Sequence, residues 1–189
     1  MKDLKTAMLL FVALALLLGG LYPAIVTVAA TLLFPRQSQG SLINNEQGTI
    51  IGSTLIGQPF SADKYFWPRP SATSDVPYNT MASGGSNLSV TNQAWARQID
   101  ERAQALRQSG ISGEIPADLV TASASGLDPH ISPEAAVLQI SRVAKARGMS
   151  IDRLREIVAK NSESRQLGIL GMPRVNVLAL NLALDREQP

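Results

Sequence analysis

The side chains closest to a catalytic set lie between positions 123 and 130. Ser123, Ser125, Asp128 and His130 supply two hydroxyls, a carboxylate and the only imidazole of the chain, and acyl transfer needs a serine, a base and a carboxylate that orients the base. Residues two apart in a loop need not face each other, and no Gly-x-Ser-x-Gly sequence accompanies them. We therefore expect Asp128 and His130 to be loop or capping residues, and the sequence predicts no catalytic residue.

Other reactive centres lack the residues that they require. The chain has no cysteine, which excludes disulfides, thiolate metal sites and cysteine nucleophiles. One histidine is too few for a typical histidine-rich metal site, although a cation site with oxygen ligands stays open. No P-loop and no TVGYG-like filter loop is present, so we expect neither ATP hydrolysis nor a pore from this chain alone. The net charge of +2 favours no nucleic-acid partner.

The distribution of charge singles out the amino-terminal end. Residues 6–35 form a run of 30 without a charged side chain. A helix over this run would be about 45 Å long, against about 30 Å for the hydrocarbon core of a bilayer. We therefore expect a transmembrane helix over residues 6–34. A cleaved secretory signal fits less well, because such signals have an apolar stretch of about 7–15 residues and here apolar character continues to Phe34. A buried helix of a soluble protein is the third alternative.

Small and kink-forming residues indicate that this helix packs against other membrane helices. Gly19, Gly20 and Pro23 interrupt it near its middle, where a lone span exposed to lipid would gain nothing from weakening residues. Thr27 and Thr31 lie four apart on one face, where their hydroxyls can bond back to the helix or across to a neighbour. The alternative is that glycine and proline are simply frequent in membrane helices.

The basic residues around the span predict its orientation. Lys2, Lys5 and the α-amino group precede it, whereas only Arg36 follows it before Lys64. Because cytoplasmic flanks carry the excess of positive charge, we expect residues 1–5 to be cytoplasmic. Residues 35–189 would then lie outside the cytoplasm.

Residues 35–189 are predicted to form a single compact extracytoplasmic α+β domain. Its first part is rich in Gly, Ser, Pro and Asn, which predicts short strands at 49–51 and 54–56 set between glycines. Pro68 and Pro70 exclude a helix interior, so residues 65–71 should be an ordered extended loop. The glycines of 82–87 allow an anion-binding nest, but a plain turn is favoured.

The chain becomes helical in pattern after residue 91. Asn92 is a suitable N-cap for a helix that runs to about Ser109 and stops at Gly110. One face of this helix is apolar, and we interpret the charged residues of the other as a solvated face. They are Arg97, Asp100, Glu101, Arg102 and Arg107.

Two further helices are indicated by their caps, and a third by its pattern. Ser132 begins a helix that ends at Gly148, and Ser150 can cap the next one, so that the two form a helical pair. Residues 175–184 are ambiguous between strand and helix. Asn176 as an N-cap favours the helix.

Six blocks of sequence carry a resemblance to a known family. They are GSTLIGQ at 52–58, RPSA at 69–72, ASGGSNL at 82–88, LVTASASGLD at 119–128, RVAKAR at 142–147 and VNVL at 175–178. In this order and behind an amino-terminal span, they resemble the C chain of Kdp-type potassium-transporting ATPases. The resemblance covers nearly the whole chain.

This resemblance implies an accessory subunit of a complex in the bacterial inner membrane. In that family a channel-like A chain carries potassium, a P-type ATPase B chain hydrolyses ATP, and a very small F chain completes the assembly. The C chain is held to stabilise the assembly and to act as a catalytic chaperone that raises the ATP affinity of the B chain. ATP and potassium are thus handled by the partners, and the C chain has no cofactor of its own. Within the matching blocks, Arg69, Ser86 and Asn87 are candidate contact residues at the domain surface.

The chaperone role must be reconciled with the expected orientation. If only residues 1–5 face the cytoplasm, a nucleotide site on the large domain would lie on the wrong side of the membrane from the ATP pool. We therefore expect any effect on nucleotide affinity to be transmitted through helix packing, or by stabilising one conformation of the ATPase, as a coupling free energy between sites. The alternatives to a subunit are a membrane-anchored extracytoplasmic enzyme and an anchored ligand-binding module.

Overall fold

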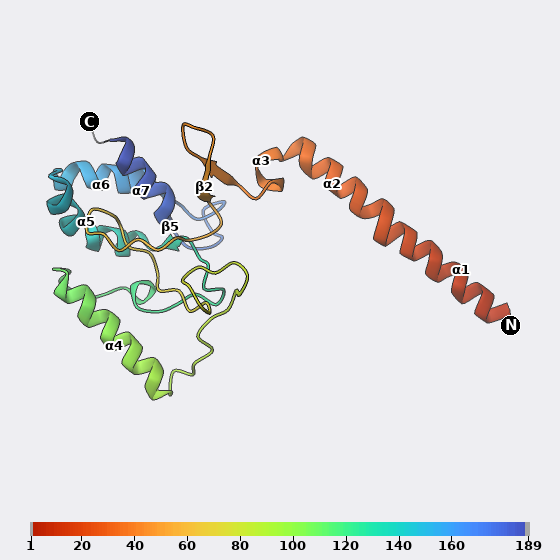
Figure 1. Cartoon of the computed structure of the whole chain (residues 1–189), viewed down its shortest axis with the longest axis horizontal. Helices are drawn as coiled ribbons and strands as arrows, with labels where there is room; N and C mark the ends of the chain where they lie inside the picture. The colour runs from red at the N-terminus through yellow and green to blue at the C-terminus, as the bar shows by residue number, and fades with distance from the viewer. Residues whose placement is uncertain (1, 188–189) are drawn as a thin grey trace. The chain divides into compact units, whose positions relative to one another are not determined.

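A computed structural model describes residues 2–187 and divides the chain into two compact units. The first unit comprises Met1–Ile51 and the second Gly52–Pro189. Each unit is described by itself, beginning with the first (Figure 1).

A single long helix dominates the first unit. α1 (Lys2–Leu16), a π-helical turn η1 (Leu17–Leu21) and α2 (Tyr22–Leu33) follow one another without a break, over 32 residues. By length and composition the helix is able to cross a membrane, and none of it is buried against the rest of the chain. The helix predicted over residues 6–34 is therefore present, and it starts four residues earlier.

Pro23 produces a π-helical turn rather than a break in the helix. A proline has no N–H to donate to the carbonyl four residues earlier, and its ring crowds that carbonyl. Here the Tyr22 N–H bonds to the Leu17 oxygen, five residues back instead of four. The turn therefore contains one residue more than an α-helical turn, which is a π-bulge. The α-helical pattern is therefore interrupted near its middle, as expected, but by a π-helical turn that contains Gly19 and Gly20 and does not end the helix. The Thr31 hydroxyl bonds back to the Thr27 oxygen at 2.5 Å, as the spacing allowed.

A short helix and a hairpin follow. α3 (Pro35–Ser38) is succeeded by β1 (Leu42–Asn44) and β2 (Ile50–Ser53), which pair in a two-stranded sheet. Of the two predicted strands, the one at 49–51 is confirmed, whereas 54–56 is a turn. The reason is local, because Ser53 accepts the Leu55 N–H with its hydroxyl and the Ile56 N–H with its carbonyl. Such bonds compete with strand pairing.

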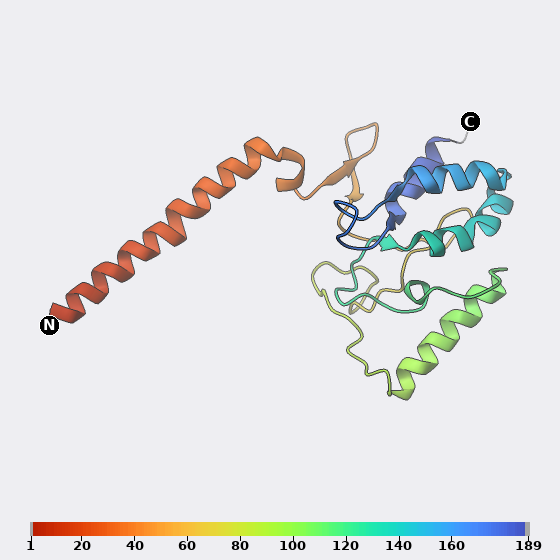
Figure 2. The same cartoon turned by 180° about the vertical axis from the view of Figure 1, so that it is seen from behind.

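The second unit packs three helices with a small antiparallel sheet (Figures 1 and 2). β3 (His130–Ile131), β5 (Arg174–Asn176) and β4 (Ser162–Glu163) are arranged in the order β3-β5-β4, with His130 opposite Asn176 and Ser162 opposite Val175. The helices are α5 (Pro133–Arg147), α6 (Ile151–Lys160) and α7 (Val177–Arg186). Leu154, Val143, Val175, Leu180 and Leu184 are among the fully buried side chains of the core.

The predicted helix caps are confirmed. The side chains of Ser132, Ser150 and Asn176 each accept a backbone N–H of the first turn, and Gly148 ends α5 with a left-handed conformation. Residues 175–184, whose sequence is ambiguous between strand and helix, contain both: Val175 belongs to β5, and the favoured helix begins at Val177. α4 (Gln93–Gln108), capped by Asn92, lies at the edge of the unit, and the 3-10 turn η2 (Ala117–Leu119) follows it (Figure 1).

Between Ser53 and α4 the chain has no helix or strand, and it runs across the second unit as loops. Residue 65 is a bend and residues 66–71 have no assigned helix, strand or turn, so the loop predicted from Pro68 and Pro70 is present. Residues 83–89 have no assigned helix, strand or turn, so the turn favoured for 82–87 is absent over most of its length. Asn87 has a left-handed backbone, with φ of 51°. Gly84 donates its N–H to the Ser125 oxygen, and a Cβ on Gly85 would lie 3.0 Å from the Ala124 oxygen. These glycines therefore permit a close approach of two loops.

Candidate functional site

Two buried amides hold a loop that we call the clamped loop, residues 63–67. Asn181 of α7 accepts the Phe66 N–H at 2.8 Å and donates to the Phe66 oxygen at 3.0 Å. Gln139 of α5 does the same for Trp67, at 2.8 and 3.1 Å. Both amides are almost completely buried. Each therefore replaces the neighbouring strand that an extended segment would otherwise need.

Two arginines complete the attachment of the clamped loop. Arg142 donates to the main-chain oxygens of Asp63 and Tyr65 at 2.7 and 3.1 Å, and its guanidinium stacks on Trp67 at 3.7 Å from the ring centre. Burial lowers the pKa of Arg142 to about 10, and the nearby Asp63 charge opposes this shift. Arg147 donates to the Lys64 oxygen at 2.6 Å. These cations are thus engaged by carbonyl groups of their own chain.

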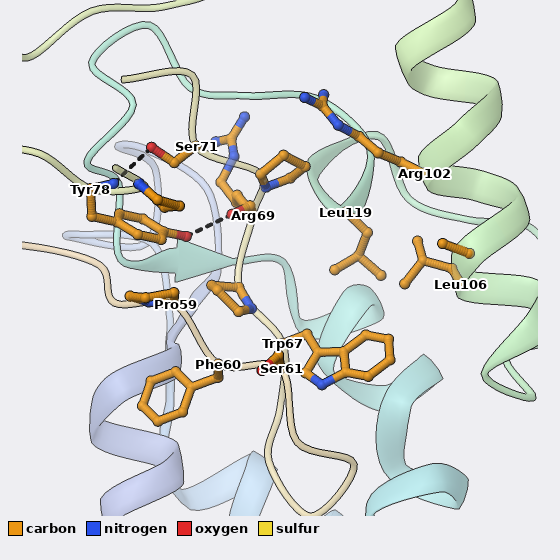
Figure 3. Close-up of a pocket in the computed structure, with 14 residues that line it drawn as sticks. Pro59, Phe60, Ser61, Trp67, Arg69, Ser71, Tyr78, Arg102, Leu106 and Leu119 are labelled. Carbon is orange, nitrogen blue, oxygen red and sulfur yellow. Dashed lines mark hydrogen bonds between the residues drawn. The ribbon is translucent and has the colours of Figure 1, made fainter. Parts of the chain in front are cut away.

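A cavity of about 390 Å³ lies beside the clamped loop, between residues 59–78, α4 and η2 (Figure 3). Tyr78 fixes one wall, because its hydroxyl donates to the Arg69 oxygen at 2.6 Å and its N–H donates to the Ser71 hydroxyl at 2.9 Å. Burial raises the pKa of the Tyr78 phenol, and the Asp128 charge adds to this effect. The phenol is therefore a neutral donor at physiological pH.

Arg102 corrects one expectation about α4. The charge pattern of α4 predicts a solvated position for Arg102, but its side chain is partly buried and lines the cavity. Its Nη1 donates to the Val120 oxygen at 2.8 Å, which draws the side chain toward the segment after η2. The other charged residues of that face, Arg97, Asp100, Glu101 and Arg107, are exposed as expected. The charged face of α4 therefore includes one partly buried residue, Arg102, among exposed ones.

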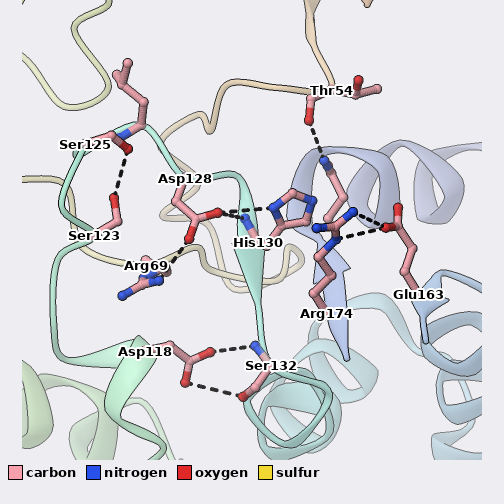
Figure 4. A network of polar contacts seen from close by, with 12 residues as sticks. Thr54, Arg69, Asp118, Ser123, Ser125, Asp128, His130, Ser132, Glu163 and Arg174 are labelled. Carbon is pink, nitrogen blue, oxygen red and sulfur yellow. Dashed lines mark hydrogen bonds and ion pairs between the residues drawn. The ribbon is translucent and has the colours of Figure 1, made fainter. Parts of the chain in front are cut away.

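Asp128 joins Arg69 and His130 in a polar network (Figure 4). One carboxylate oxygen accepts from Arg69 Nη1 at 2.9 Å, and the other accepts the His130 N–H at 3.0 Å and lies 3.1 Å from His130 Nδ1. Burial by itself raises the pKa of Asp128, but the hydrogen bonds from His130 and the charges of Arg69 and His130 outweigh it and lower the pKa to about 2. Asp128 is thus an ionised loop residue.

The serines near this pair do not complete a catalytic triad. The hydroxyls of Ser123 and Ser125 lie 3.4 Å from each other, and Ser125 also accepts the Leu127 N–H. Neither hydroxyl bonds to the His130 ring. Asp128 accepts a backbone N–H two residues further along the chain, so its predicted role as a loop residue is confirmed. The same prediction is wrong for His130, which begins β3 and pairs with Asn176.

The remaining candidate residues lie apart from this network. Ser86 and Asn87 are exposed and, unlike Arg69, neither contacts Asp128 nor lines the cavity. Gly19 and Gly20 belong to the helix of the first unit, where a Cβ would meet no atom within 4 Å. The surface of that helix around them is therefore open.

Sequence reasoning missed two features of the second unit. The buried amides Gln139 and Asn181 could have been suspected from polar residues standing at core positions of apolar helices. The second feature is an exposed apolar hairpin, in which Leu167 is 89% and Ile169 75% exposed. The sequence signal for this hairpin is the largely apolar run Leu167-Gly168-Ile169-Leu170, which is followed by Gly171 and Met172.

The chain is similar to known proteins over nearly its whole length. A family model described as "K+-transporting ATPase, c chain" (KdpC) matches residues 4–186. The chain is 60% identical to the potassium-transporting ATPase KdpC subunit of Geobacter sulfurreducens and 57% identical to that of Geobacter metallireducens, each over the full length of both chains. It is 54% identical to the corresponding subunit of Burkholderia ambifaria, covering 100% of this chain and 98% of the relative. Because the match spans the apolar helix and the second unit alike, the chain belongs to the KdpC family of K⁺-transporting ATPase c chains.

Proposed function

We propose that this chain is the membrane-anchored accessory subunit of a potassium-transporting ATPase of the bacterial inner membrane. One observation carries the proposal: an apolar helix of 32 residues has no part buried by its own chain. Such a surface needs lipid or other helices around it. The names of the relatives, which are subunits of a potassium-transporting ATPase, identify the complex.

The proposed partners follow from the family resemblance. They are the channel-like A chain, the P-type ATPase B chain and the small F chain, with the lipid bilayer around them. Residues 1–5 lie in the cytoplasm and residues 35–189 outside it, in keeping with Lys2 and Lys5 at the short end. In this arrangement the chain stabilises the assembly and performs no chemistry of its own.

We also propose that the chain raises the ATP affinity of the B chain without binding ATP. Its support is the proposed orientation, because residues 35–189 then lie on the opposite side of the membrane from the ATP pool. In addition, Arg142 and Arg147 are already held by carbonyl oxygens of the clamped loop. The effect then passes through the packed membrane helices, as a coupling free energy that favours one conformation of the ATPase.

Gentle extraction from membranes tests the subunit role. A tagged full-length chain, produced with its neighbours and extracted in mild detergent, should retain two much larger membrane chains in fixed ratio. The matched control keeps the second unit and replaces residues 6–34 by a generic polyleucine span. We expect the control to reach the membrane and to lose its partners. Recovery of the unaltered chain alone would overturn the proposal.

Kinetics of the complex test the effect on ATP. The KM for ATP of the complete complex is compared with that of a complex lacking this chain, and we expect a higher KM in its absence. An equal KM would contradict the chaperone role. Nucleotide binding by the full-length chain alone in nanodiscs would contradict the indirect route.

A further inference from the structure

The cavity beside the clamped loop has mostly apolar walls. Leu106 of α4 and Leu119 of η2 form one side, and Trp67 and Phe60 belong to the loop that forms the other (Figure 3). Four prolines also line it, and their rings make these loop segments stiff. Its volume of about 390 Å³ falls within the range of about 300–1,000 Å³ that is typical of small-molecule sites.

The charged side chains on the wall are both cationic. Arg69 and Arg102 line the cavity, and no aspartate or glutamate is among its lining residues. Arg69 is neutralised on one side by Asp128, at 2.9 Å. Its Nε is buried without a hydrogen-bond partner. A buried donor of this kind costs free energy until an acceptor reaches it.

Arg102 is the less compensated of the two. Its contacts are the Val120 oxygen at 2.8 Å and Gln98 Oε1 at 3.5 Å, and none of the ion pairs within residues 2–187 includes it. Burial lowers the pKa of Arg102, and the neighbouring Glu101 charge only partly opposes this. A partly desolvated guanidinium without a carboxylate is stabilised by an anion.

We propose that this cavity binds a small amphipathic anion, a carboxylate or phosphate monoester on an aliphatic or aromatic body. The anionic group lies at the guanidinium of Arg102, a lining residue that extends from α4 above Leu119 in Figure 3, and the body packs against Leu106, Leu119 and Trp67. The site goes beyond the subunit role and does not depend on it. A cationic ligand is disfavoured by both arginines, and a neutral apolar one leaves Arg102 uncompensated.

Trp67 provides the signal for a binding experiment. The chain has two tryptophans, and the second, Trp95, lies on α4 and does not line the cavity. A Trp95→Phe chain in nanodiscs of zwitterionic lipid therefore reports on the cavity through Trp67 fluorescence. We expect octanoate to give a saturable change, with octan-1-ol and octylamine at least tenfold weaker.

Matched variants assign the binding to this site. Arg102→Gln should weaken octanoate about tenfold, as expected for loss of one charge-assisted contact, and should leave octan-1-ol unchanged. Arg107→Gln removes the same charge from the exposed face of the same helix and should bind octanoate as the parent does. Ala105→Phe, at an exposed lining position, should block both ligands by filling the cavity.

The opposite results are equally clear. Equal affinities for octanoate and octan-1-ol, or equal losses in Arg102→Gln and Arg107→Gln, would overturn the proposal. So would octanoate binding that survives Ala105→Phe, or the absence of a saturable change in the parent chain. If Arg102→Gln loses its helical circular dichroism, that variant is unfolded and is set aside. The affinities of the three ligands for the parent chain and for Ala105→Phe then still test whether the cavity binds an anion.

Discussion

Gln139 binds Trp67 through both polar groups of its main chain, accepting from the N–H at 2.8 Å and donating to the carbonyl at 3.1 Å. The two residues are 72 positions apart in the sequence. Asn181 repeats the arrangement one residue earlier, at Phe66. The clamped loop, and with it one wall of the cavity, is therefore positioned by α5 and α7.

Replacing Gln139 by leucine should destabilise the second unit strongly. The change leaves both main-chain groups of Trp67 without partners and removes an acceptor of Arg142. An unsatisfied buried group costs about 1–3 kcal/mol, so we expect a loss of about 2–4 kcal/mol in the free energy of unfolding. Urea unfolding of the full-length chain, followed by Trp67 fluorescence in a Trp95→Phe background, measures it.

The control for this variant is Gln104→Leu, at an exposed position of α4. Surface substitutions of this kind change stability by about 0.5 kcal/mol or less. Equal effects of the two substitutions would show that the amide does not hold the loop.

Gly126 should tolerate alanine much less well than Gly148. Both have a left-handed backbone, with φ of 67° and 66°, so both variants incur about 1 kcal/mol of backbone strain. At Gly126 a Cβ would also lie 2.6 Å from the Gly84 oxygen, whereas at Gly148 it meets nothing within 4 Å. We expect Gly126→Ala to lose about 1–3 kcal/mol more than Gly148→Ala, as measured by thermal unfolding. Equal melting temperatures would refute the close approach of the two loops.

The depressed pKa of Asp128 predicts a specific dependence on acid. The pKa of Asp128 is about 2 in the folded chain, below its ordinary value of 3.8, so the unfolded chain takes up the proton first. The stabilisation is complete above about pH 4 and disappears as the pH falls through 2. Asp128→Asn should therefore lower the free energy of unfolding at pH 7 by about 1–2 kcal/mol after solvent screening, and flatten its decline between pH 4 and pH 2.

The same titration with Asp152→Asn provides the comparison. Asp152 pairs with Arg155, but its side chain is 88% exposed. Its profile should follow that of the parent chain. A parental profile in Asp128→Asn would mean that the network around Arg69 and His130 contributes nothing to stability.

Gly20→Leu should reduce recovery of the complex severalfold. A Cβ at Gly20 has no neighbour within 4 Å in this chain, so the substitution leaves the chain itself undisturbed and acts on a partner helix packed at that face. Complex yield after mild detergent extraction is the measurement. Ala29→Leu lies about two and a half turns further on, on the other side of the helix, and should assemble normally. Normal assembly of Gly20→Leu would contradict packing at this face.

The sequence predicted those parts of the fold that depend on local patterns. The charge-free run, the caps at Ser132, Ser150 and Asn176, and the prolines of residues 65–71 each act within a few residues. The π-turn before Pro23 escaped prediction because a helix can absorb a missing bond without ending. Arg102 was misplaced because its partner, the Val120 carbonyl, is fixed by the loop after α4 and not by helical periodicity.

The candidate sites were less predictable for the same reason. The cavity combines segments around Pro59, Trp67, Tyr78, Arg102 and Leu119, and no pattern in the sequence brings them together. A spacing of two residues does not predict that Asp128 and His130 meet, whereas an Asx-type turn places the two side chains in contact. Contacts between segments that are distant in the sequence, such as those that line the cavity, are found only in the folded structure.

The two amide clamps have a consequence for how this protein can diverge. Because Gln139 and Asn181 hold the loop through its peptide groups, any residue other than proline at 66 or 67 still offers them the same bonds. The shape of the loop therefore depends on two helix positions, while its exposed side chains, those of Asp63 and Lys64, are free to change. Homologues could in this way exchange the surface beside the cavity, and suit different ligands or neighbours, without altering their framework.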